Sequence, residues 1–153
     1  MDTLELHLTQ ALKEAKTYNP ERMKSILQEL DPYYTHFRNS PRQYPREFYI
    51  NELSGLEDTR RSLTKSLSEY DKILAELDYN IKQIKALRQL IYASDSLSDT
   101  LQMYIDHEAI AMQETMTKFY KRIRNPLNYK DKWPALKVKL DSAMRYDLQS
   151  SEN

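Results

Sequence analysis

The sequence predicts an all-α protein: an elongated antiparallel helical bundle built on a coiled-coil hairpin, with short N- and C-terminal helices. Its 153 residues include one glycine and six prolines, which leaves few sites for the tight turns that join β-strands. Apolar residues recur at helical spacing along most of the chain. Residues 62–91, SLTKSLSEYDKILAELDYNIKQIKALRQLI, contain neither glycine nor proline, and such an uninterrupted amphipathic run is typical of a long helix.

Residues 1–44 are expected to form short helices followed by a proline-rich connection. Apolar residues at helical spacing predict a first helix that ends at TYNP. The pair Asn19–Pro20 predicts an N-cap with proline at the first helical position, so a second helix begins there. Asp31 and Pro32 repeat this arrangement and predict a break, which makes PYYTHF one or two separate helical turns. We expect NSPRQYP to be a loop, because its two prolines lie four residues apart.

Residues 45–92 are expected to form a single helix with a sustained heptad pattern. Gly55 is its weak point, since glycine costs about 1 kcal/mol against alanine inside a helix. Apolar residues beside the heptad seam, including Ile73 and Leu90, widen the stripe and require more than one neighbouring helix. The thirteen seam positions, eleven of them apolar, are Tyr49, Leu53, Leu56, Arg60, Leu63, Leu67, Tyr70, Leu74, Leu77, Ile81, Ile84, Arg88 and Ile91.

In the segment ASDSLSD, we expect Ser94, Asp95 and Ser96 to end the long helix and to cap another over residues 97–124. A connection this short favours an antiparallel hairpin. The shorter helix would extend about 42 Å against roughly 70 Å for the longer one, so it leaves residues 46–64 uncovered. After NPLNY, Pro134 is expected to open a last short helix. The three parts, 1–44, 45–124 and 125–153, are expected to form one structural unit.

The uncovered end of the long helix is the predicted partner-binding surface. A helix that its hairpin mate does not cover must bury its apolar side chains against something else. We favour a shared arrangement, in which the N-terminal helices and another protein subunit both pack there. The side chains predicted to meet this partner are Tyr49, Leu53, Leu56 and Leu63.

A second candidate surface is the basic segment, residues 118–139, KFYKRIRNPLNYKDKWPALKVK, in which eight basic residues accompany a single acidic one, Asp131. Interleaved aromatic side chains could stack on nucleic-acid bases while the cations neutralise phosphates, or the segment could bind an acidic protein. The structural alternative is that the cations favour a helix C-terminus and that the aromatic residues belong to the core. The residues of the predicted basic patch are Lys118, Lys121, Arg122, Arg124, Lys130 and Lys132.

The sequence carries no recognisable catalytic or metal-binding motif. It has no cysteine, and its single glycine excludes the glycine-rich phosphate and dinucleotide loops. His107 lies between Asp106 and Glu108, but the residues three and four positions after it are Ile110 and Ala111, so we expect a surface histidine. We therefore expect no catalytic residues, no metal ligands and no cofactor.

These patterns predict a non-enzymatic interaction or scaffold subunit of an intracellular multiprotein complex, in the nucleus or cytoplasm. Small coiled-coil chains of this composition are typical of kinetochore, Mediator and chromatin assemblies, which is an analogy of class only. The alternative is a nucleic-acid- or chromatin-binding helical protein that uses residues 118–139. An enzyme or ligand carrier would need a polar constellation inside the bundle, which the sequence does not indicate. No apolar run approaches the length of a membrane span, so no membrane partner is expected.

Overall fold

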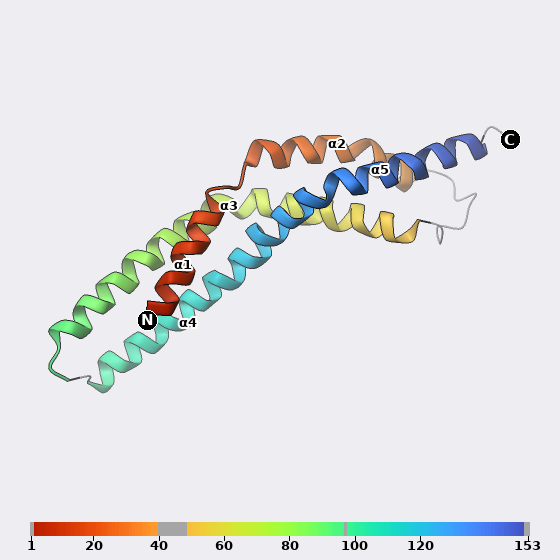
Figure 1. Cartoon of the computed structure of the whole chain (residues 1–153). Helices are drawn as coiled ribbons and strands as arrows, with labels where there is room; N and C mark the ends of the chain where they lie inside the picture. The colour runs from red at the N-terminus through yellow and green to blue at the C-terminus, as the bar shows by residue number, and fades with distance from the viewer. Residues whose placement is uncertain (1, 40–48, 97, 152–153) are drawn as a thin grey trace. The chain divides into compact units, whose positions relative to one another are not determined.

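The computed structural model describes residues 2–39, 49–96 and 98–151, and every regular element in these ranges is helical. The predicted all-α class is therefore confirmed. The helices labelled in Figure 1 are α1 (Asp2–Ala15), α2 (Pro20–Asn39), α3 (Ile50–Ala93), α4 (Asp99–Phe119) and α5 (Asn125–Ser151). Between α4 and α5 the chain forms a π-helix, η2 (Tyr120–Arg124).

The chain divides into two compact units, and each is made of segments that are far apart in the sequence. Unit 1 comprises Met1–Tyr18 and Glu69–Arg124, and unit 2 comprises Asn19–Ser68 and Asn125–Asn153. Helix α3 contributes to both units, because its 44 residues extend about 66 Å and different segments cover its two halves. This division differs from the three consecutive parts that the sequence suggests.

Unit 1 contains the expected antiparallel hairpin, formed by the second half of α3 and by α4 with η2. The Asn80 amide donates a hydrogen bond to Thr115 Oγ1 at 2.7 Å. The ion pair of Glu76 with Lys118 spans 3.2 Å, and that of Glu69 with Arg122 spans 2.7 Å. Residue numbers fall along α3 as they rise along α4 and η2, so the two helices run in opposite directions.

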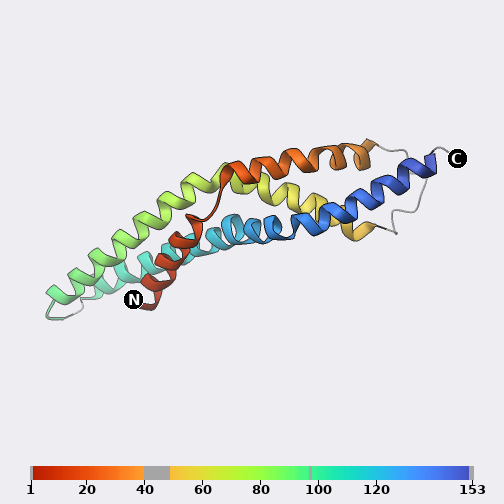
Figure 2. The same ribbon diagram turned by 45° about the horizontal axis from the view of Figure 1, so that its top comes forward.

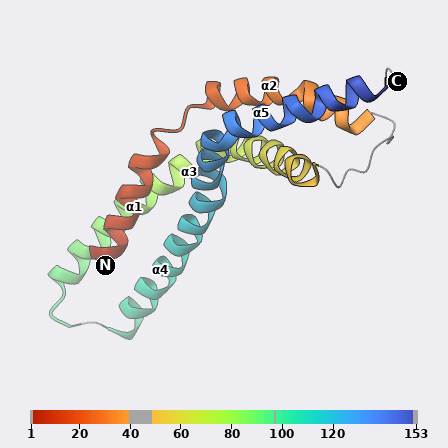
Figure 3. The same cartoon turned by 45° about the vertical axis from the view of Figure 1, so that its right-hand side comes forward.

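Helix α1 is the third helix of unit 1, and Figure 3 shows it, in red, beside the green part of α3. Arg88 of α3 pairs with Asp2 and Glu5 near one end of α1, and Tyr70 donates to the carbonyl oxygen of Ala15 at the other end. The core of unit 1 is apolar and includes Leu8, Ala11, Leu77, Ile84, Met112, Phe119 and Ile123, all buried.

Unit 2 is also built from three helices: α2, the first part of α3, and α5. The Trp133 indole donates to Glu29 at 2.6 Å, and further along the same two helices His36 lies 3.2 Å from Asp147. Helices α2 and α5 therefore run parallel. In Figure 2 the yellow start of α3 runs beside the blue α5, and a Cβ atom on Gly55 would lie 3.4 Å from the Leu136 side chain. The only glycine thus stands where α3 and α5 approach closely.

Two predicted helix boundaries are wrong, because proline does not interrupt the helices at either place. Pro32 lies inside α2, and Pro134 lies inside α5. Residues buried on both sides of Pro32, Leu30 and Tyr33, anchor α2 across the lost hydrogen bond. The expected gap at NPLNY is also absent, since η2 leads directly into α5.

The other predicted boundaries fall close to the observed ones. Asn19 caps α2 as expected, because its Oδ1 accepts hydrogen bonds from the N–H groups of Glu21 and Arg22. The cap of α4 is Ser98, whose Oγ accepts from the Leu101 N–H at 3.1 Å, rather than the serines before it. Most of the predicted loop NSPRQYP and the first predicted residues of α3 lie outside the described residues.

Candidate functional surfaces

Chemistry-bearing side chains do not gather in the part of the chain that the structure describes. No group of three or more His, Asp or Glu side chains there could hold a metal ion. His107 is exposed, and its neighbour Asp106 accepts a hydrogen bond from Gln102. Among the described residues, no buried side-chain nitrogen or oxygen atom lacks a hydrogen-bond partner.

None of the described helices combines the length and the apolar character that crossing a membrane requires.

The predicted partner-binding residues lie in unit 2, and two of the four are already covered there. Leu56 and Leu63 are buried, whereas Tyr49 and Leu53 are half-buried. The Tyr49 hydroxyl donates to Asp147 of α5 at 2.7 Å, so part of this surface packs against the chain itself. The expectation of an uncovered end assumed that the helix after the hairpin turn stops at residue 124, but α5 continues from it. A partner-binding role for Tyr49 and Leu53 stays a prediction.

Tyr49 also lines a shallow groove of about 420 Å³ between the start of α3 and the C-terminal half of α5. Val138 and Tyr146 on its wall are exposed apolar side chains. The complete lining is Tyr49, Glu52, Val138, Lys139, Ser142, Ala143 and Tyr146.

Within unit 1, most cations of the predicted basic patch form ion pairs with glutamates of the same unit. Besides the pairs of Lys118 and Arg122 in the hairpin, Arg124 binds Glu14 of α1 at 2.7 Å. This hydrogen bond to Glu14 is the main cause of the raised pKa of Arg124, whose guanidinium also lies 4.6 Å from the Tyr120 ring centroid. These ion pairs link α4 and η2 to α3 and α1 within unit 1.

Within unit 2, the last aromatic residue of the basic segment, Trp133, is part of the core. Trp133 is only 1% exposed, and its hydrogen bond to Glu29 is the main cause of the lowered pKa of that carboxyl. Lys130 lies 3.6 Å from Asp131, whereas no ion pair is found for Lys132 among the described residues. With Phe119 fully buried as well, two of the four aromatic side chains of the segment cannot reach a nucleic-acid base.

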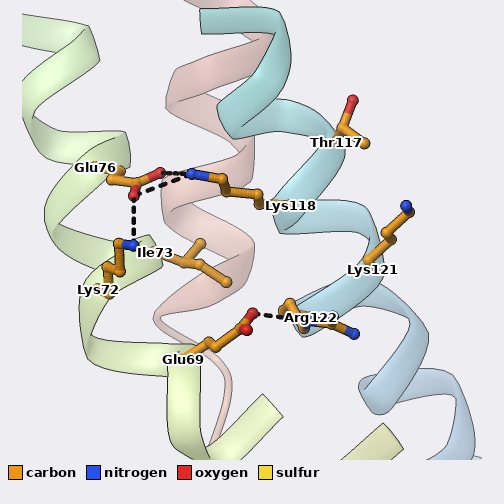
Figure 4. A pocket seen from close by; sticks show the side chains of 8 residues that line it. All are labelled: Glu69, Lys72, Ile73, Glu76, Thr117, Lys118, Lys121 and Arg122. Atoms are coloured by element: carbon orange, nitrogen blue, oxygen red, sulfur yellow. Dashed lines mark hydrogen bonds and ion pairs between the residues drawn. The ribbon is translucent and has the colours of Figure 1, made fainter. Parts of the chain in front are cut away.

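The hairpin of unit 1 carries a pocket of about 310 Å³ on the face away from α1 (Figure 4). Figure 4 shows α1, in faint red, behind the two helices. Of the four cations in the pocket wall, Lys121 is the one for which no ion pair is found among the described residues. The lining consists of Glu69, Lys72, Ile73, Glu76, Thr117, Lys118, Lys121 and Arg122.

The same face of the hairpin continues from this pocket toward the turn as an exposed apolar strip, which we call the open face. Heptad spacing identifies it: Ile110 and Met103 lie seven and fourteen residues before the pocket residue Thr117, and Leu90 lies fourteen residues after Glu76. Each of its large side chains is between 44% and 61% exposed. The open face consists of Tyr79, Leu90, Met103, Tyr104 and Ile110.

No pattern in the sequence led us to predict the open face as a binding surface. Leu90 stood out only as a residue that widens the apolar stripe of its helix. The signal that could have found the rest was the set of apolar residues of α4 that lie off its main stripe, Met103, Tyr104 and Ile110.

Comparisons of the chain with models of known protein families, with curated proteins and with solved structures found no match.

Proposed function

We propose that this chain is a non-enzymatic interaction or scaffold subunit of an intracellular multiprotein complex, and that it assembles through the open face of its hairpin. The observation that carries the proposal is the exposure of five large apolar side chains on one face of two adjacent helices. Single exposed apolar residues are ordinary, but several large ones at heptad spacing on neighbouring helices are typical of an interaction surface. Tyrosine, present twice in the patch, is enriched at the centres of protein interfaces.

The three-helix architecture of unit 1 indicates how a partner would dock. Helix α1 packs along one side of the hairpin, and Figure 4 shows the pocket on the other side. Heptad spacing from the pocket residues puts the open face on the same side as the pocket. An added helix or helix pair on that side would complete a bundle of four or more helices, in which apolar side chains interdigitate. The pocket beside it supplies charged groups at the margin of such an interface, where polar residues are common.

We place this complex inside the cell, in the nucleus or the cytoplasm. Support comes from the absence of cysteine in the sequence, which is compatible with a reducing compartment. A role in an assembly such as a kinetochore, Mediator or chromatin complex rests on the analogy of class alone.

The second candidate function is binding of nucleic acid or chromatin through residues 118–139. Lys121 and Lys132 favour it, since no ion pair is found for either among the described residues. The pairing of Lys118, Arg122 and Arg124 with glutamates weakens it, because those cations already neutralise charge within the chain. Binding that weakens steeply with salt, and that glutamates at Lys121 and Lys132 remove, would favour this function.

The test of the proposed function compares two variants that each add two glutamates to the hairpin. Met103→Glu with Ile110→Glu places carboxylates on the open face, whereas Gln89→Glu with Gln102→Glu places them on exposed positions elsewhere on the same helices. Each chain is immobilised, and the proteins it captures from nuclease-treated native lysate are quantified. We expect at least a tenfold loss of captured protein for the open-face variant only, with unchanged circular dichroism. Equal capture by both variants would overturn the proposal.

A further inference from the structure

We infer that the open face binds a second copy of this chain, with the two hairpins antiparallel across a two-fold axis that passes near His107. The inference deepens the proposed function and rests on it, because it names the first partner of the same surface. It is argued from the order of charged and apolar groups along the hairpin.

The apolar strip of the open face has charge of opposite sign at its two ends. Beyond one end lies the hairpin turn, where Asp95 and Asp99 are exposed. Beyond the other end lies the pocket, where four basic residues outnumber the two glutamates Glu69 and Glu76. Three of these cations pair with the glutamates, so the excess positive charge includes Lys121, for which no ion pair is found among the described residues. The order along the hairpin is therefore acidic turn, apolar strip and basic pocket.

This order is self-complementary under two-fold symmetry. A two-fold axis brings the same patch of both subunits together in reverse order, so each acidic turn meets the basic pocket of the partner. The apolar strips then cover one another at the centre. A parallel arrangement would instead place turn against turn and pocket against pocket, which juxtaposes like charges.

The spacings along α4 agree with an axis at the centre of the strip. His107 lies midway between Met103 and Ile110 and is exposed. Lys118 follows it by eleven residues, about 16 Å along the helix. Asp99, the first residue of α4, precedes His107 by eight residues, about 12 Å, and the turn that carries Asp95 lies beyond Asp99. Lys121 lies one turn beyond Lys118 and has a long, flexible side chain, so it can reach the same carboxylates.

A second copy fits this surface better than an unrelated helix does. An apolar helix of another protein would match the strip, but nothing in the strip itself requires opposite charges at its two ends. A second copy supplies both matching ends at once, so one interface contains each favourable charge contact twice.

The first experiment locates the axis, and the absence of cysteine provides a clean background. In the full chain carrying His107→Cys, the two new thiols should face each other across the two-fold axis, between helices whose own axes lie about 8–10 Å apart. A short bismaleimide should therefore cross-link this variant into a dimer. Gln113→Cys, exposed elsewhere on α4, is the matched control and should remain monomeric under the same treatment. Equal cross-linking of both variants would overturn the inference.

The second experiment tests the orientation by charge exchange, with dimerisation measured by sedimentation equilibrium at low salt. Asp95→Lys and Lys121→Glu should each raise the dimer dissociation constant several-fold, because each creates two like-charge contacts. An equimolar mixture of the two variants should form a heterodimer with nearly the wild-type constant, since each altered end then meets its complement. A mixture that dimerises no better than either variant alone would exclude this antiparallel register.

The outcomes separate this inference from the proposed function. A wild-type chain that stays monomeric at every concentration, yet loses captured protein in the open-face variant, would overturn the second copy as occupant and leave the proposed function standing. A dimer that Met103→Glu with Ile110→Glu does not weaken would show that the copies associate elsewhere, and would also overturn the inference. Loss of both dimer and captured protein in that variant supports both.

Discussion

At the scale of single residues, the buried polar groups fix which helices lie side by side. Asn80 and Thr115 are buried and satisfy each other between α3 and α4. In unit 2, Trp133 donates to Glu29, and burial together with a hydrogen bond to Asp141 raises the pKa of Tyr33 to about 12. Such pairs are costly to separate in a low-dielectric interior, so they disfavour shifted packing of the same helices.

Trp133→Phe should lower the free energy of unfolding by about 1–2 kcal/mol at pH 7, because it removes a hydrogen bond to a charged acceptor. The pKa of Glu29 is lowered in the folded state, so the stabilisation by its ionised form is present above the unfolded pKa. It is lost as the pH falls through the folded pKa. Urea unfolding at several pH values should therefore show that the difference in the free energy of unfolding between wild type and Trp133→Phe becomes smaller at acidic pH.

The control for this prediction is the same substitution in a Glu29→Gln background. The neutral amide does not titrate, so Trp133→Phe should then lower the free energy of unfolding by the same amount at every pH. A difference that narrows in acid in both backgrounds would assign the pH dependence to another group.

At the scale of elements, the sequence predicted the helices well and their ends less well. The Asn19 cap, the long helix and the hairpin could be predicted, because the patterns that specify them involve residues close together in the sequence. Pro32 and Pro134 misled the prediction, because burial against other helices compensates the hydrogen bond that each proline removes. That compensation depends on neighbours far away in the sequence, which local patterns do not contain.

The candidate surface was harder to predict than the fold. One wrong helix boundary, the predicted break at NPLNY, placed the uncovered surface at the wrong end of the long helix. Because the helix was predicted to end at NPLNY, no helix from the C-terminal part was predicted to pack against the start of the long helix. The structure instead continues through η2 into α5, and Leu56 and Leu63 are buried. The π-helix has no signature in the sequence, since its extra residue per turn is a property of packing. The exposed apolar strip lies near the hairpin turn.

Pro32→Ala should raise the free energy of unfolding by about 1–2 kcal/mol. Proline inside a helix costs about 3 kcal/mol relative to alanine, and the greater freedom of the unfolded alanine chain offsets part of that gain. The matched control is Pro20→Ala at the first position of α2, where the missing N–H has no partner within the helix, so its effect should stay within about 0.5 kcal/mol. Urea unfolding measures both, and equal effects would contradict the assignment of Pro32 to a helix interior.

At the scale of the whole molecule, one helix belongs to both compact units. Residues 50–68 of α3 pack in unit 2 and residues 69–93 pack in unit 1. The single tryptophan, Trp133, lies in unit 2, so its fluorescence reports on that unit, whereas circular dichroism reports on all the helices. The two signals together can show whether the units unfold as one.

Leu77→Asp should destabilise both units, although residue 77 lies in unit 1. Leu77 is 0% exposed, and a carboxylate buried there without a partner costs several kcal/mol. Unfolding residues 69–93 would remove the helix that continues into unit 2, so we expect tryptophan fluorescence and circular dichroism to fall together at a lower urea concentration than in wild type. Ala75→Asp is the control: it adds the same charge at an exposed position on α3 and should cost less than about 1 kcal/mol. If circular dichroism of the Leu77→Asp variant falls at lower urea while its Trp133 fluorescence still changes at the wild-type urea concentration, the two units unfold separately. The shared helix would then not couple them.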